Sequence, residues 1–137
     1  MISDVNGDLN GYWDWSAGDA YMAAGAVTSN IVDMLNYLEQ HITEKESLKS
    51  CHESLLEINT STKSYEAMGI HMDEIALAWI IDNDNNFIWH NGGTDNFNSY
   101  MGFNLENKTG VVILSNLPPN YRIPATVLGV KLLKEIQ

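Results

Sequence analysis

The chain has 137 residues, the length of one domain, and its 45% hydrophobic and 18% charged residues are typical of a globular protein. Its 18 acidic and 7 basic side chains give a net charge of −11, which argues against nucleic acid and anionic lipid as partners because both repel such a surface. The single cysteine, Cys51, excludes an internal disulfide. No apolar run is long enough to span a membrane, and residues 1–4 do not begin a signal peptide. We expect one domain over residues 1–137.

The N-terminal segment is rich in aromatic and small residues. Residues 6–21 hold Gly, Asp and four large rings at Tyr12, Trp13, Trp15 and Tyr21 without a clear period. This composition predicts an ordered loop, because such rings are costly to leave in water. The run Ala-Ala-Gly-Ala-Val at 23–27 predicts close backbone packing.

Two helices are expected next. The sequence Thr-Ser-Asn at 28–30 is a capping cluster, and Asp33 falls in the first turn that follows it. An apolar stripe then recurs at helical spacing, formed by Ile31, Met34, Leu35, Leu38 and Ile42. A weaker helix is predicted over 44–58, with its leucines on one side.

The second half of the chain predicts a sheet and a closing helix. Apolar runs at 75–81, 87–90, 98–105 and 111–114 are separated by polar turns at 82–86 and 106–110, which predicts four antiparallel strands. A final helix begins near Pro124, a residue suited to the first turn. The fold class is therefore α+β, an antiparallel sheet of about four strands packed with helices.

The run His-Asn-Gly-Gly-Thr at 90–94 is the strongest candidate for chemistry. Histidine is a side chain suited to proton transfer, and the Gly92–Gly93 pair allows backbone N–H groups to approach a substrate closely, as oxyanion stabilisation requires. The alternative is a histidine at the end of a strand followed by a glycine turn, which is the commoner case for an isolated motif.

Other candidate sites fail on spacing. The acidic runs at 82–86 and 4–8 lack the Gly and Glu that a calcium loop needs at its sixth and twelfth positions, so the first predicts a hairpin turn. His52-Glu53 lacks the second histidine of a zinc-protease helix, because that position is Leu56. His41 and His71 have no partner by spacing, and Cys51 has no setting that would activate it. We expect neither a metal nor a cofactor.

In order and spacing, three stretches resemble the C-terminal half of the serine beta-lactamase family, in the branch that holds class C enzymes, penicillin-binding-protein-like proteins, esterases and D-amino-acid peptidases. Residues 23–34 are similar to the family's small-residue turn before a capped helix. Ala78-Trp79 is similar to its Gly-x-Gly-Trp strand. Residues 89–94 with Phe97, and then 110–116, resemble its His-x-Gly strand and its closing strand that ends in Ser-Asn. The resemblance covers about residues 10–137 and implies an incomplete beta-lactamase/transpeptidase-like fold.

The resemblance also implies roles for residues. His90-Asn91-Gly92 would take the place of the family's Lys-Thr-Gly element, with His90 acting near the nucleophile and the Gly93 N–H as an oxyanion donor. Asn91, Gly92 and Thr94 would contact the substrate. The literal Lys-Thr-Gly at 108–110 lies at a polar turn leading into a strand, so we interpret it as coincidence.

The chain departs from the family at its nucleophile. No lysine is preceded three positions earlier by serine, and no tyrosine is followed two positions later by Asn or Ser. We expect the Ser-x-x-Lys and Tyr-x-Asn elements, together with the first strands of the sheet, upstream of Met1.

Two hypotheses follow. The chain is the C-terminal part of a serine hydrolase that acts on a small-molecule or peptide substrate, inactive alone, or it is a non-catalytic ligand- or protein-binding module that keeps the fold. The resemblance implies a parent that works outside the cytoplasm. An open sheet edge predicts self-association, or cover by a missing N-terminal half.

Overall fold

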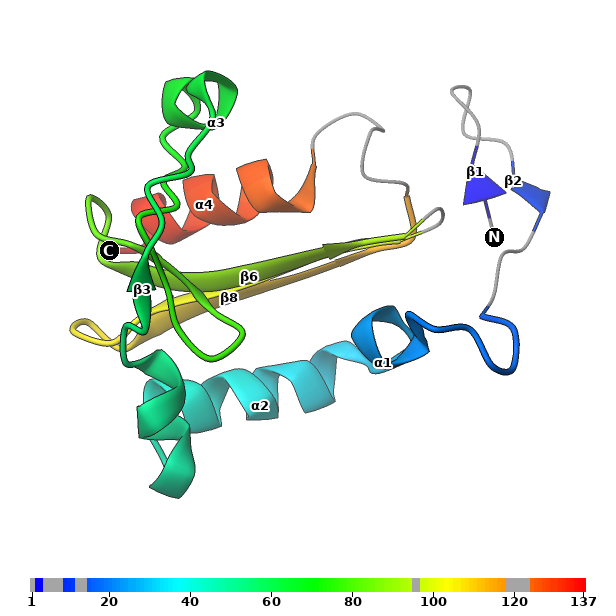
Figure 1. Ribbon diagram of the computed structural model, residues 1–137, viewed down its shortest axis with the longest axis horizontal. Helices are drawn as coiled ribbons and strands as arrows, with labels where there is room; N and C mark the ends of the chain where they lie inside the picture. Colours follow the sequence, from blue (N-terminus) through cyan, green and yellow to red (C-terminus); the bar gives the residue numbers. More distant parts are fainter. Residues whose placement is uncertain (1, 4–8, 12–14, 95–96, 118–123) are drawn as a thin grey trace.

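The computed structural model describes residues 2–3, 9–11, 15–94, 97–117 and 124–137. Two helices, α2 (Ile31–Ile42) and α4 (Ala125–Glu135), lie on opposite faces of a central sheet, as Figure 1 shows. This three-layer arrangement confirms the predicted α+β class. Within the described residues, no helix has both the length and the hydropathy needed to cross a membrane.

The central sheet is an antiparallel meander in which each strand pairs with the next one in the chain. It has six strands rather than the four predicted. They are β3 (Leu56–Glu57), β4 (Glu74–Ile75), β5 (Ile80–Asp82), β6 (Phe87–Gly93), β7 (Asn98–Asn104) and β8 (Thr109–Ser115). The two edges of the sheet are β3 and β8.

Helix α2 forms where its capping signal predicts it. The Asn30 side chain accepts hydrogen bonds from Val32 N and Asp33 N at 3.0 and 3.1 Å, satisfying two N–H groups of the first turn. The inner side of α2 buries Leu38 against β7 and β8. At Gly110 of β8 an added Cβ would lie 2.9 Å from Leu38, so the glycine lets the helix approach the strand closely.

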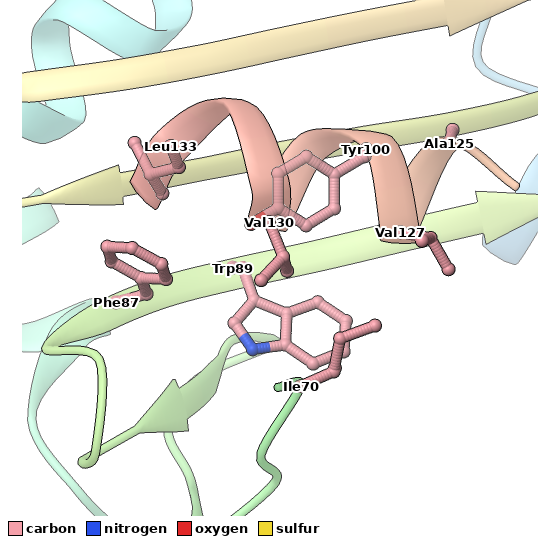
Figure 2. Close-up of a cluster of buried hydrophobic side chains, with 8 residues drawn as sticks. All are labelled: Ile70, Phe87, Trp89, Tyr100, Ala125, Val127, Val130 and Leu133. Carbon is pink, nitrogen blue, oxygen red and sulfur yellow. The ribbon is translucent and has the colours of Figure 1, made fainter. Parts of the chain in front are cut away.

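Helix α4 covers the other face, and the larger core lies beneath it. Figure 2 shows the Tyr100 ring between β7 and the helix, with Trp89 and Phe87 extending the cluster along β6. Tyr100 lies directly against Gly102 and Gly129, where a Cβ would overlap the ring. Pro124 is the N-cap of α4, close to the predicted start.

The helix predicted over 44–58 is wrong beyond its first half. The chain forms a 3-10 helix, η1 (Glu46–His52), and Glu53 directly after it is extended. Leu56 then pairs with Ile75 of β4. The leucines there were assigned to one helix face, but Leu55 and Leu56 are exposed and belong to the edge of the sheet.

The strand predicted over 75–81 is also wrong as a single element. The chain reverses within it, because Ala76 N donates to Trp79 O at 2.8 Å and Ala78 adopts a left-handed φ of 62°. An apolar run that looked like one buried strand is thus the hairpin of β4 and β5. The connection that follows β3 holds an unpredicted short helix, α3 (Lys63–Ala67), capped by Thr62.

The turns predicted at 82–86 and 106–110 are confirmed, the second one residue or so earlier than expected. Asp82 organises the first: this buried carboxylate accepts hydrogen bonds from His71 N, Asn85 N and Asn85 Nδ2 at 3.2, 2.9 and 2.6 Å. Burial raises the pKa of Asp82, against the effect of those hydrogen bonds. The side-chain oxygens therefore build a hairpin turn.

At the N-terminus, β1 (Ile2–Ser3) pairs with β2 (Leu9–Gly11), and a one-turn helix, α1 (Met22–Gly25), precedes α2. Of the loop predicted over 6–21, residues 6–8 and 12–14 lie outside the described residues, and residues 9–11 form β2 instead of a loop. The predicted close packing at 23–27 is confirmed at Gly25, where an added Cβ would lie 2.6 Å from the Trp15 ring.

Candidate active site at the end of strand β6

Alternation along β6 sorts the candidate residues between the two faces of the sheet. Trp89 faces α4 in the larger core, whereas Ile88 packs in the cluster under α2. His90 therefore points to the α2 side, where it is exposed. Asn91 points the other way, and its Nδ2 donates to Thr126 Oγ1 of α4 at 2.8 Å. This hydrogen bond of Asn91 links β6 to α4.

The register of β6 sets the direction of the Gly93 N–H. Thr94 N donates to Phe97 O at 2.8 Å, so residues 94 and 97 form a hydrogen-bonded pair at the end of the β6–β7 ladder. Pairs alternate in an antiparallel ladder, so Gly93, opposite Asn98, directs its N–H and C=O away from β7. On that other side, the described pairing with β5 ends at Trp89 opposite Ile80. The Gly93 N–H thus points to an open side of the strand.

A cavity of about 280 Å³ adjoins this point and is lined by residues from two distant parts of the chain. Gly93 and Thr94 contribute from the end of β6, and Trp15, Tyr21, Ala24 and Gly25 from the segment around α1. Trp15 Nε1 donates to Gly25 O at 3.2 Å, which fixes the indole against the small-residue turn. The lining holds no charged side chain, so the cavity suits an uncharged or apolar group.

Two further residues of the run complete the geometry. Thr94 Oγ1 is buried and has no hydrogen-bond partner among the described residues. At Gly92 an added Cβ would lie 3.0 Å from Ser99 Oγ of β7. Ser99 is thus the hydroxyl that β7 presents opposite Gly92, on the same face as His90.

The comparison with known proteins identifies the family of the chain. The family model for Beta-lactamase matches residues 3–131, nearly the whole chain. The chain belongs to the beta-lactamase family. This result confirms the family resemblance of the sequence, and the beta-lactamase family domain carries a serine hydrolase-like fold.

Among curated proteins, the family resemblance is local. Protein flp from Staphylococcus aureus strains NCTC 8325 / PS 47, COL and N315 is 37% identical over 46 residues, which is 34% of this chain. The matched stretch spans only 9% of those relatives, so the chain corresponds to a small part of their length.

In this beta-lactamase-family chain, the run at 90–94 lies at the end of β6. The literal Lys-Thr-Gly at 108–110 lies elsewhere, at the β7–β8 turn and the start of β8. Lys108 lies in the β7–β8 turn with a left-handed φ of 59°, and its Nζ donates to Ile42 O at 3.1 Å. In the described part of the chain, no cluster of three or more His, Cys, Asp or Glu side chains is arranged to hold a metal ion.

Sequence reasoning missed a buried histidine pair under α2. His41 Nδ1 and His52 Nε2 lie 2.8 Å apart, and both rings are buried against Trp79 and Phe103. Burial, together with the smaller effect of the neighbouring His52, lowers the pKa of His41 to about 4. Burial also lowers the pKa of His52, although Glu44, 3.6 Å from its Nδ1, opposes the shift.

The two histidines lie eleven residues apart in the chain, so neither helical period nor a ligand motif indicates the pair. Only the return of η1 beneath the C-terminal end of α2 joins them. The pair lies at the opposite end of α2 from the cavity at Gly93, because His41 is in the last turn of the helix.

Proposed function

We propose that this chain provides one side of a serine hydrolase site that cleaves an amide or ester through an acyl-serine. The proposal rests on one observation, which is the register of β6. That register leaves the Gly93 N–H pointing to an open side beside an apolar cavity, and His90 is exposed three residues earlier on the same strand. Family membership supports the choice of acyl transfer as the reaction class.

In this proposal, serine attack on the substrate carbonyl puts negative charge on the carbonyl oxygen, and the Gly93 N–H donates to that oxyanion. Such a donor lowers the barrier by about 3 kcal/mol in a site that excludes water. His90 lies on the α2 face, where its ring nitrogens would hold or move a proton between the serine and the leaving group. Water then attacks the acyl-serine and releases the acid.

The serine itself would come from outside this chain, since the sequence contains no Ser-x-x-Lys. The chain alone would therefore be inactive. The substrate is a small molecule or peptide, and the cavity beside Gly93, with Trp15 and Tyr21 in its lining, would take an uncharged part of it.

The test uses the longer polypeptide that joins this chain to a Ser-x-x-Lys segment upstream. In that polypeptide Gly93→Pro removes the N–H and should lower kcat/KM for a chromogenic ester about 10²–10³-fold. Gly93→Ala keeps the N–H and should cost less than about tenfold. Equal losses in the two variants would contradict the oxyanion role of Gly93.

The alternative is a non-catalytic module that keeps the cavity for binding, which the absent Ser-x-x-Lys motif favours. The coding sequence upstream of residue 1 distinguishes the two. A Ser-x-x-Lys and a Tyr-x-Asn in the same reading frame support the hydrolase. Their absence would contradict it and favour the module.

A further inference from the structure

A single polar contact holds the short helix η1 against the end of α2. The hydrogen bond between His41 Nδ1 and His52 Nε2 spans 2.8 Å and joins the last turn of α2 to the last residue of η1. In the described part of the chain, no other group of η1 forms a hydrogen bond beyond its own N-cap, Lys45. Figure 1 shows the segment between α2 and β3 at the C-terminal end of α2. The position of η1 therefore depends on His52.

The backbone at both ends of η1 suits a local movement. Glu44, just before the N-cap, has a left-handed φ of 49°, and Glu53, just after η1, is extended. Neither residue belongs to a helix or a strand, so η1 can move about them while α2 and β3 keep their hydrogen bonds. None of the described members of the larger core under α4 is a histidine. A change in the histidine pair therefore acts on η1 first.

The neutral pair has a defined arrangement of protons. Glu44 Oε1 lies 3.6 Å from His52 Nδ1 and favours a proton on that nitrogen. His52 Nε2 is then the acceptor, so His41 Nδ1 donates to it. His41 Nε2 keeps a lone pair and has no hydrogen-bond partner among the described residues. The first added proton thus has one open nitrogen, in a pocket where His41 is 1% exposed.

The groups that face the pair offer little to stabilise a positive charge. On α2, the Tyr37 ring packs edge-on to His41, and burial with the nearby Cys51 raises the pKa of the Tyr37 hydroxyl, which stays uncharged. The helix η1 adds the Cys51 thiol, and its one lysine is exposed. The sheet side presents the rings of Trp79 and Phe103.

The nearest charges do not balance two protons. Glu44 is the ion-pair partner of His52, and within the described residues no second carboxylate pairs with either histidine of this contact. Lys108 Nζ donates to Ile42 O, next to His41, and adds a positive charge at the end of α2. With two protons, both nitrogens of the 2.8 Å contact would be donors. The hydrogen bond that holds η1 is therefore lost in the doubly protonated pair.

We propose that protonation of His41 and His52 releases η1 from the end of α2 in mild acid, while the central sheet keeps its structure. After release, each imidazole regains a pKa of about 6.5. A histidine that stays neutral in the bound form then raises the ratio of released to bound η1 about 25-fold between pH 7 and 5. Burial lowers the pKa of both histidines, so their effects have the same sign. This device is independent of the proposed hydrolase role.

Labelling of Cys51 by a dithiodipyridine reagent, which reacts with thiols in acid, measures the release. Cys51 is the single cysteine, and it is half-buried on η1. Dividing each rate by that of the urea-unfolded chain at the same pH removes the chemistry of the thiol itself. The normalised rate should rise at least tenfold from pH 7 to 5. His41→Gln removes one titration, keeps a hydrogen-bonding side chain and should reduce that rise at least fivefold.

The control is Asn36→Gln, at an exposed position of α2, which leaves both histidines in place and should keep the wild-type rise. Hydrogen exchange read by mass spectrometry locates the change, because peptides of η1 should lose protection at pH 5 while those of β7 keep it. A wild-type rate that is the same at both pH values would overturn the proposal. Equal loss of protection in η1 and β7, or an undiminished rise in His41→Gln, would also overturn it.

Discussion

His41 and His52 share one hydrogen bond in an aromatic pocket and remain neutral there, because a charged imidazole would lose its hydration. The Nε2 of His41 is buried without a hydrogen-bond partner among the described residues. A proton added to this pair has Glu44 as its nearby anion, on the side of His52. The pair therefore makes the packing of α2 and η1 sensitive to acid.

The sign of the resulting pH dependence follows from the pKa of His41, lowered from 6.5 to about 4 by burial. As pH falls from about 7 to 4, the unfolded chain binds protons that the folded chain refuses, so the free energy of unfolding decreases. His41 alone accounts for about 3 kcal/mol of this loss.

His41→Gln keeps a hydrogen-bonding side chain without the titration. Urea unfolding measured from pH 7 to 4 should therefore show a flatter dependence in this variant than in the wild type. The control is Asn36→Gln, at an exposed position of the same helix, which leaves both histidines in place and should keep the wild-type slope. Burial raises the pKa of Asp82, so protonation of Asp82 increases the free energy of unfolding as pH falls, opposite to the effect of His41. This contribution is present in both variants, so the comparison between them isolates His41. Parallel curves for His41→Gln and the wild type would disprove the assignment.

At the scale of elements, the packing of α4 on β7 depends on two positions without side chains. The Tyr100 ring fills the space that Cβ atoms at Gly102 and Gly129 would need. Gly129 lies inside α4, where glycine costs about 1 kcal/mol relative to alanine. The helix keeps a poor helix former because the ring packs directly against its backbone.

Gly129→Ala should thus destabilise the protein by about 2 kcal/mol or more, although alanine improves the helix propensity. Urea unfolding at one protein concentration measures this loss. Lys131→Ala, at an exposed position of the same helix, should change the stability by less than about 0.5 kcal/mol. A Tyr100→Val background should reduce the cost of Gly129→Ala. A more stable Gly129→Ala would show that the ring moves freely.

Elements with a local signal could be predicted from the sequence. The cap at Asn30 and the stripe through Leu38 placed α2, and Pro124 placed α4. Failures occurred where apolar runs have no period of their own. Residues 75–81 hide a hairpin at Ala78, and the leucines near 55 belong to a strand edge. In both cases pairing with a distant segment decides the structure, and a single sequence does not show that pairing.

At the scale of the molecule, the run at 90–94 was visible because its residues are adjacent, whereas the cavity beside Gly93 was not. The cavity combines the end of β6 with Trp15 and Tyr21, roughly seventy residues earlier in the chain. The buried His41–His52 pair arises in the same way from segments that only the fold joins.

The account assigns this beta-lactamase-family chain one side of a hydrolase site and no nucleophile. Incubation of the chain alone with a chromogenic ester, and separately with a cephalosporin, followed by intact-mass analysis, tests that claim most directly. The account predicts no turnover above the buffer rate and an unchanged protein mass. A covalent adduct on this chain, mapped to a residue such as Ser99 beside Gly92, would contradict it.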